Sequence, residues 1–271
     1  MKFICSVFVF FLSGIAIARP ADMDYPIGVA AMNDGRVFVA DRNLHAVWKI
    51  QAGVAEVFFQ GSKQFRTPLN AIRCLGFDKQ GKLLAGDSST REVYRFDETG
   101  KPVALTGGAI GIPMAIATDS KGDIYVADLE ASQIYRIPAD GGKAEAFVSV
   151  PAPRGLTIDQ QDRLWIVSHG KDQILRVDPS RKIEVIVSGQ PFQFPHCIVV
   201  GGDGTAFVSD GYGKCIWKWA GSAKPEKLPG SEALKNPVGL ALRNGELLVA
   251  DPHLKSIFSI PAGGGQLTKL H

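Results

Sequence analysis

The chain has 271 residues, of which 45% are hydrophobic and 21% are charged, as in an ordinary globular protein and unlike a disordered or collagen-like chain. Its 30 lysines and arginines exceed its 27 aspartates and glutamates by only three, which excludes the basic stripe of a nucleic-acid-binding protein. Its 30 glycines and 16 prolines separate short apolar runs, a pattern typical of many turns and strands. We therefore expect an all-β fold and no nucleic-acid partner.

The first 18 residues have the features of an export signal. Lys2 precedes an apolar stretch over residues 3–12, and Ala16 and Ala18 form the small-x-small pattern that signal peptidase cleaves. The apolar stretch is shorter than the roughly 20 residues of a membrane-spanning helix. We therefore predict a signal peptide over residues 1–18 and a secreted or periplasmic protein without a membrane anchor. Loss of Lys2 with the signal lowers the net charge to +2.

Six copies of one strand follow each other along the rest of the chain. They cover residues 36–41, 82–87, 123–128, 163–168, 205–210 and 246–251, and their last residues are 46, 41, 40, 42 and 41 positions apart. Each copy lies between two further strands, and a fourth, weaker strand ends most units. A four-stranded sheet of about 41 residues cannot bury both faces alone, whereas sheets stacked around an axis can. The repeat predicts one domain over residues 19–271, a six-bladed β-propeller with four antiparallel strands per blade.

The expected strand register has a consequence for how the ring closes. The chain enters on an innermost strand and ends on an outermost one, over residues 266–270. Closure would then depend on packing between the first and the sixth blade. Alternatively, residues 19–24 add an edge strand, and the sequence leaves both possibilities open. In either case we expect a monomer.

The repeated pattern Pro-x-Gly-apolar-Ala, a turn, apolar-aromatic-Val-Ala-Asp and then Ile-x-Arg-Ile resembles the NHL repeat. More broadly, it resembles the six-bladed propellers that include the gluconolactonase-like (SMP-30/LRE-like) family and the peptide-amidating lyases. The resemblance extends over essentially all of the predicted mature chain. It implies the propeller fold more strongly than any function, because one fold supports many chemistries.

The predicted mature chain has three cysteines, Cys74, Cys197 and Cys215, because Cys5 leaves with the signal. An odd number leaves at least one free thiol in an oxidising compartment. The repeat places Cys74 and Cys197 on opposite blades, and it places Cys197 and Cys215 two strands apart in one blade. Two strand spacings, about 9.5 Å, exceed the Cα separation of a disulfide. We therefore expect three free thiols.

Residues common to nearly every blade are expected to be architectural. Five copies of the second strand end in the same residue type, giving Asp41, Asp87, Asp128, Asp210 and Asp251. We interpret these carboxylates as acceptors for N–H groups of the turn that follows. The fourth blade departs from the pattern, with Ser168 in place of the aspartate and His169 after it.

The residue that opens each inner strand is expected at the mouth of the central channel. Across the blades this position holds Ile27, Arg73, Met114, Arg154, His196 and Val238. Loops between the second and third strands bring His45, Ser88, Ser89, Glu130, His169, Tyr212 and His253 to the same face. Arg73, Arg154 and His196, with Met114 between the two arginines in blade order, form a cationic set suited to a carboxylate or phosphate. Alternatively, both arginines point into water or pair with loop carboxylates.

The two resembled enzyme groups imply different metal sites at these positions. Gluconolactonase-like enzymes bind a divalent cation through acidic and amide side chains, the oxygen ligands that hard cations require, and none of the six positions is Asp, Glu or Asn. The amidating lyases hold zinc through histidines of Pro-His steps on three blades, of which only His196 is present, too few for tetrahedral zinc. We therefore expect no cofactor, although the sequence leaves a divalent metal open, its usual ligands being absent. By motif, Tyr212 matches a catalytic tyrosine of the lyases.

Two classes of function remain open. The first, which we favour, is a binding protein whose channel mouth holds a small anion, a peptide or a protein. The second is a lyase or hydrolase that acts on an anionic substrate, with His196 or His169 as acid and base and with Tyr212 nearby. Each histidine could instead be purely structural.

Overall fold

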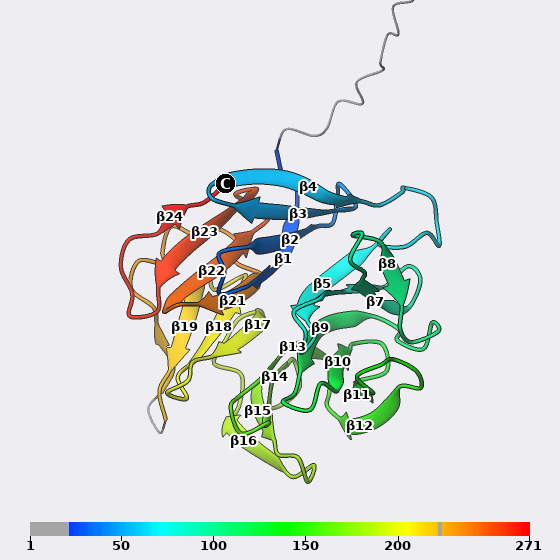
Figure 1. Cartoon of the computed structure of the whole chain (residues 1–271). Helices are drawn as coiled ribbons and strands as arrows, with labels where there is room; N and C mark the ends of the chain where they lie inside the picture. Colours follow the sequence, from blue (N-terminus) through cyan, green and yellow to red (C-terminus); the bar gives the residue numbers. More distant parts are fainter. Residues whose placement is uncertain (1–21, 222–223) are drawn as a thin grey trace, which may run out of the picture.

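The computed structural model describes residues 22–221 and 224–271, and it confirms the six-bladed β-propeller (Figure 1). Six four-stranded antiparallel sheets, each made of consecutive strands, surround a central axis. The described residues form strands and turns only. None of them belongs to a helix that could cross a membrane. The predicted signal peptide, residues 1–18, lies outside the described residues.

The 24 strands follow the blades in chain order. Blades 1 and 2 contain β1 (Pro26–Ala31), β2 (Val37–Asp41), β3 (Ala46–Gln51), β4 (Val54–Gln60), β5 (Ile72–Phe77), β6 (Leu83–Asp87), β7 (Glu92–Phe96) and β8 (Pro102–Ala104). Blades 3 and 4 contain β9 (Pro113–Thr118), β10 (Ile124–Asp128), β11 (Gln133–Ile137), β12 (Glu145–Ser149), β13 (Pro153–Ile158), β14 (Leu164–Ser168), β15 (Ile174–Val177) and β16 (Ile183–Val187). Blades 5 and 6 contain β17 (Pro195–Val200), β18 (Ala206–Asp210), β19 (Cys215–Trp219), β20 (Glu226–Lys227), β21 (Gly239–Arg243), β22 (Glu246–Asp251), β23 (Ser256–Pro261) and β24 (Thr268–Lys269).

The hydrophobic core lies between the blades. Each of six clusters of buried side chains joins two neighbouring sheets, as where Phe38 of blade 1 packs with Leu75 and Tyr94 of blade 2. All residues of β2, β6, β10, β14 and β18 are buried. These second strands are covered on both faces, which explains their continuous apolar sequences. Burial on both faces is what a single blade could not achieve.

Glycines of the Pro-x-Gly pattern let neighbouring inner strands approach closely. A Cβ atom on Gly155 would lie 2.8 Å from Cα of Cys197 on the next blade, and one on Gly239 would lie 3.1 Å from Cα of Gly28. Such a Cβ atom on Gly239 would also lie 2.9 Å from the carbonyl oxygen of Ile27, and real Cβ atoms essentially never lie closer than 3.0 Å to another heavy atom. Glycine therefore lets the inner strand approach the backbone of the next blade at these two positions.

The ring closes by packing between blades 1 and 6, the first of the two possibilities that the sequence left open. Met23 is buried in the cluster that joins these blades, and Leu270 packs against the same cluster. The rings of Trp48 and His271 lie 6.1 Å apart. Residues 22–24 form no strand, so within the described part of the chain the edge-strand alternative is not found.

The repeated aspartates have the structural role that was predicted for them. Asp128 is buried and accepts hydrogen bonds from the backbone N–H groups of Glu130 (3.0 Å) and Ala131 (3.3 Å) in the following turn. It also accepts from Gly111 (2.8 Å) and Ile112 (3.0 Å), just before the inner strand. The carboxylate at the end of the second strand therefore links the segment before the inner strand to the turn after the second strand.

Ser168 makes a shorter version of the same link. Its Oγ donates to the carbonyl of Pro151 (2.7 Å) and accepts from the N–H of Gly170 (2.9 Å).

Cys74, Cys197 and Cys215 are free thiols, as expected. Cys74 Sγ donates to the carbonyl of Pro113 (3.4 Å), on the neighbouring blade. Burial raises the pKa of Cys74 to about 12 and that of Cys215 to about 11. These thiols therefore stay protonated and behave as small apolar side chains.

Candidate functional site

A β-bulge near the start of the inner strands sets the direction of the side chain at the channel mouth. In β1, Pro26 pairs with Asp41 and Gly28 with Ala40, so Ile27 between them has no partner. The same register shift occurs near the start of β5, β9, β13 and β17. A bulge bends the strand and redirects the side chain of its extra residue. The repeat therefore sets up a ring of side chains whose identity can vary without disturbing the blades.

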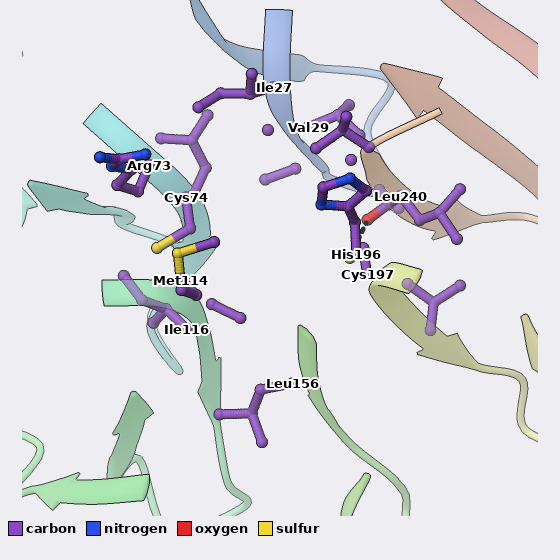
Figure 2. A pocket seen from close by; sticks show the side chains of 18 of the residues that line it. Ile27, Val29, Arg73, Cys74, Met114, Ile116, Leu156, His196, Cys197 and Leu240 are labelled. Carbon is purple, nitrogen blue, oxygen red and sulfur yellow. Dashed lines mark hydrogen bonds between the residues drawn. The ribbon is translucent and has the colours of Figure 1, made fainter. Parts of the chain in front are cut away.

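All six residues predicted for the channel mouth line one cavity of about 340 Å³. Figure 2 shows four of them, Ile27, Arg73, Met114 and His196, around a common space. The volume lies at the lower end of the range for small-molecule sites. Tyr25, Arg42 and Asn236 also line the cavity, although the sequence analysis did not identify them.

Arg73 is half-buried and is positioned by a neighbouring loop. Its Nε donates to Ser88 Oγ (2.9 Å), in the turn after β6. Burial lowers the pKa of the Arg73 guanidinium, and the positive charges of Arg42 and Arg154 lower it further. The charges of Arg42 and Arg154 therefore act on Arg73 across the same cavity.

Of the three arginines, Arg154 is the one with a buried nitrogen, Nε, that makes no hydrogen bond within the described residues. Its guanidinium lies over the ring of Phe194, with Cζ 5.4 Å from the ring centroid. Burial lowers the pKa of Arg154. The cation is thus held by an aromatic face, which leaves its charge unneutralised.

None of the three cavity arginines forms an ion pair with a described residue. Glu130, the loop carboxylate expected on this face, pairs instead with Arg91 (2.7 Å). The alternative in which Arg73 and Arg154 pair with loop carboxylates is therefore not found.

His196 is a neutral imidazole at the edge of the arginine cluster. Burial, followed by the nearby charge of Arg154, lowers its pKa to about 4. A Cβ atom on Gly211 would lie 2.9 Å from His196 Nε2 and would collide with Asn236 Oδ1. The imidazole and the amide therefore converge on Gly211, where both can donate or accept hydrogen bonds.

The other two candidate catalytic residues lie beside the cavity and do not line it. His169 Nε2 donates to the carbonyl of Pro195 (2.7 Å), and burial lowers its pKa. Tyr212 is 66% exposed and stacks on Phe194, with ring centroids 4.7 Å apart. The edge of Phe194 also meets His169 and His196, at centroid distances of 4.6 and 4.9 Å. Phe194, which the sequence analysis did not single out, is thus the centre of this group.

The donor atoms of the cavity do not suit a divalent cation. Its ionisable side chains are the three arginines, His196, the phenol of Tyr25 and the protonated thiols of Cys74 and Cys197, and no carboxylate lines it. A hard cation requires several oxygen ligands, and the arginines would repel it. Elsewhere in residues 22–221 and 224–271 no cluster of three or more His, Cys, Asp or Glu side chains could hold a metal ion. The metal site implied by the gluconolactonase resemblance therefore does not fit this chain.

Comparison with known proteins identifies the family. Residues 14–212 match the SMP-30/gluconolactonase/LRE-like region. The chain belongs to the SMP-30/gluconolactonase/LRE-like family. A Bacillus subtilis relative of this gluconolactonase-like propeller, YvrE, is named as a sugar lactone lactonase and is 24% identical over 155 residues. That match spans 49% of this chain and only about half, 50%, of the relative.

Two solved structures share the propeller fold. The gluconolactonase XC5397 of Xanthomonas campestris matches with a TM-score of 0.73 and 14% identity, over 92% of this chain and 87% of that one. Virginiamycin B lyase from Staphylococcus aureus matches with a TM-score of 0.68 and 18% identity, over 91% and 84% of the two chains. At these identities the likeness concerns the fold alone.

Proposed function

We propose that this gluconolactonase-like propeller binds a small organic anion, a carboxylate or a phosphate ester, at the mouth of its channel. One observation carries the proposal: Arg42, Arg73 and Arg154 line a single cavity that has no carboxylate in its lining. The three like charges repel one another, and burial removes part of the hydration of the half-buried Arg73 and Arg154, whereas Arg42 is exposed. A bound anion relieves both costs and gains charge-assisted hydrogen bonds.

Each polar residue of the mouth has a distinct part in binding. Arg73 uses Nε to hold Ser88, which leaves its terminal nitrogens for the anion. Arg154 is oriented by the Phe194 ring and presents its donors without a competing acceptor. Neutral His196 and the amide of Asn236 complete the rim as hydrogen-bond donors. A planar carboxylate matches the fork of donors that a guanidinium offers.

A second candidate function is a lyase or hydrolase that needs no metal. Family membership and the neutral state of His196 favour it, because an uncharged imidazole can accept a proton. Arg154 would then stabilise the negative charge that develops on the substrate. An anionic substrate would also raise the low pKa of His196, which brings the base closer to its useful range.

The test is a thermal-shift screen of small carboxylates and phosphate esters, since a ligand that binds only the folded state raises Tm. We expect the wild-type protein to respond and Arg154→Ala to lose the response. Arg91→Ala is the matched control, because Arg91 pairs with Glu130 and does not line the cavity. An equal response of wild type and Arg154→Ala would overturn the proposal. Turnover that is lost in His196→Ala while binding remains would favour the enzyme.

A further inference from the structure

Beneath the arginine rim, the channel is lined by a second ring of side chains that is entirely apolar. Each inner strand contributes the residue two positions beyond the mouth, giving Val29, Leu75, Ile116, Leu156, Ile198 and Leu240. Figure 2 shows Val29, Ile116, Leu156 and Leu240 around the same space as the mouth residues. The cavity therefore changes from cationic to apolar within two residues of each strand.

The apolar part of the cavity is deep enough to hold the uncharged body of a ligand. Along β1 the lining runs from Ile27 at the mouth to Ala31, which corresponds to about 13 Å of strand at 3.3 Å per residue. Below the mouth, no charged side chain of the described residues lines this length, and Thr157 supplies its hydroxyl. A ligand whose charged end is held by the arginines must place an uncharged body here.

The opposite end of the channel has a different charge. A second cavity shares Phe77, Ile116 and Leu156 with the first and is also lined by Asp78 and Asp119, together with Lys79. Asp78 is paired with Arg95 (2.8 Å), so the carboxylate of Asp119 and the ammonium of Lys79 balance at the far end. The excess of positive charge lies at the mouth, which sets the direction of an elongated ligand with one anionic end.

We propose that the ligand is an amphiphilic monocarboxylate, with its carboxylate between Arg73 and Arg154 and an unbranched apolar chain along the channel. This inference rests on the proposed function and names the class of ligand. The apolar chain gains by leaving water for the ring of aliphatic side chains. A sugar acid of equal length carries hydroxyl groups, whose lost hydration the single hydroxyl of Thr157 cannot replace.

Calorimetric titration with straight-chain carboxylates of increasing length, starting from acetate, tests whether the apolar chain of the ligand contributes to binding. We expect the association constant to rise two- to fourfold for each added CH₂, in line with its transfer free energy, until the chain fills the channel. Gluconate is the decisive comparison with hexanoate, because both have six carbons and one carboxylate; hexanoate should bind at least tenfold more tightly. Hexylammonium, with the same chain and the opposite charge, should not bind.

A substitution in the channel and a labelled ligand test whether the apolar chain of the ligand lies in the channel. Leu156→Asn should flatten the dependence of affinity on the length of the apolar chain of the carboxylate. Because this variant could fail to fold, a crystal of the wild-type protein with an ω-brominated carboxylate provides an independent readout, with bromine expected near Ile116 and Leu156.

The outcomes separate this inference from the proposed function. Binding of carboxylates with no dependence on chain length, gluconate binding as tightly as hexanoate, or bromine outside the channel would overturn the amphiphilic ligand and leave the anion site standing. Failure of every carboxylate and phosphate ester to bind would overturn the proposed function itself.

Discussion

The guanidinium of Arg154 lies over the ring of Phe194, with Cζ 5.4 Å from the ring centroid. An ion pair would also have oriented this side chain, but it would have neutralised the charge. A contact with an aromatic face orients a cation and leaves its charge available. Phe194 is in turn held by stacking with Tyr212 at 4.7 Å. This arrangement supports the proposal that Arg154 binds an anion.

Replacement of Arg154 by alanine should weaken anion binding by roughly 1.5 to 3 kcal/mol, the range for a hydrogen bond to a charged group. Folding stability should change little or rise, because the variant removes one of three like charges from the mouth. Titration calorimetry and urea unfolding measure the two effects separately. A large loss of stability with unchanged affinity would show instead that Arg154 supports the fold.

Protonation of His196 should make the protein less stable in mild acid. The folded-state pKa is lowered to about 4, whereas an unfolded histidine titrates near 6.5. Between these two values the unfolded chain binds a proton that the folded chain does not. Stability therefore rises with pH from about 4 to about 6.5 and is lost as pH falls through that window, by on the order of 2 to 3 kcal/mol.

His196→Gln provides the comparison for this pH dependence. Other groups also titrate between pH 4 and pH 6.5, so the informative quantity is the difference in unfolding free energy between wild type and variant. That difference should grow in favour of the variant as pH falls. Parallel pH profiles would mean that His196 is not responsible.

Metal removal should have no effect on folding or on anion binding. The cavity presents three arginines and no carboxylate, so a divalent cation meets like charge and finds only neutral oxygens such as that of the Asn236 amide. Melting temperatures with excess EDTA and with added Ca²⁺ or Mg²⁺ should agree with those of the untreated protein. A rise in Tm on addition of either cation would contradict this interpretation of the mouth.

The repeat made the fold and the position of the mouth predictable. An inner strand has the same role in every blade, so aligning the six copies places Ile27, Arg73 and Arg154 at equivalent points of the ring. The aspartates could be assigned to the scaffold for the same reason. A residue such as Asp128 occurs in five blades, whereas a ligand contact is needed only where the ligand lies.

The remaining site residues were not predictable because they do not belong to that ring position. Arg42 follows the last residue of β2, and Asn236 lies three positions before β21, the inner strand of blade 6. Only the folded arrangement of the loops brings them to the cavity. Glu130 pairs with Arg91 rather than with an arginine of the mouth. This pairing depends on the conformation of the loops, which the sequence repeat does not reveal.

Asp128→Ala should be strongly destabilising, in contrast to substitutions at the mouth. The variant would leave four backbone N–H groups, those of Gly111, Ile112, Glu130 and Ala131, without their acceptor. Loss of a buried carboxylate that satisfies several donors costs about 3 to 5 kcal/mol. Urea unfolding should show a smaller loss, about 1 to 2 kcal/mol, for Ser168→Ala. Equal losses would show that the aspartate is not a stronger link than the serine.

Gly211→Ala should reduce ligand affinity with little effect on the fold. The added Cβ would collide with Asn236 Oδ1 and lie 2.9 Å from His196 Nε2, so both side chains must move away from the positions they hold at the mouth. The backbone of Gly211 is not in the left-handed region, and alanine should therefore change stability by no more than about 1 kcal/mol. Affinity for a carboxylate should fall about tenfold, as for the loss of one good hydrogen bond.

Gly263→Ala is the matched control for this last variant, because a Cβ there meets no atom within 4 Å. It should leave both the affinity and the unfolding free energy unchanged. If Gly211→Ala binds carboxylates as tightly as the control, the imidazole and the amide do not contact the anion. Binding would then depend on the arginines alone, and only a measurement of turnover could still assign a role to His196.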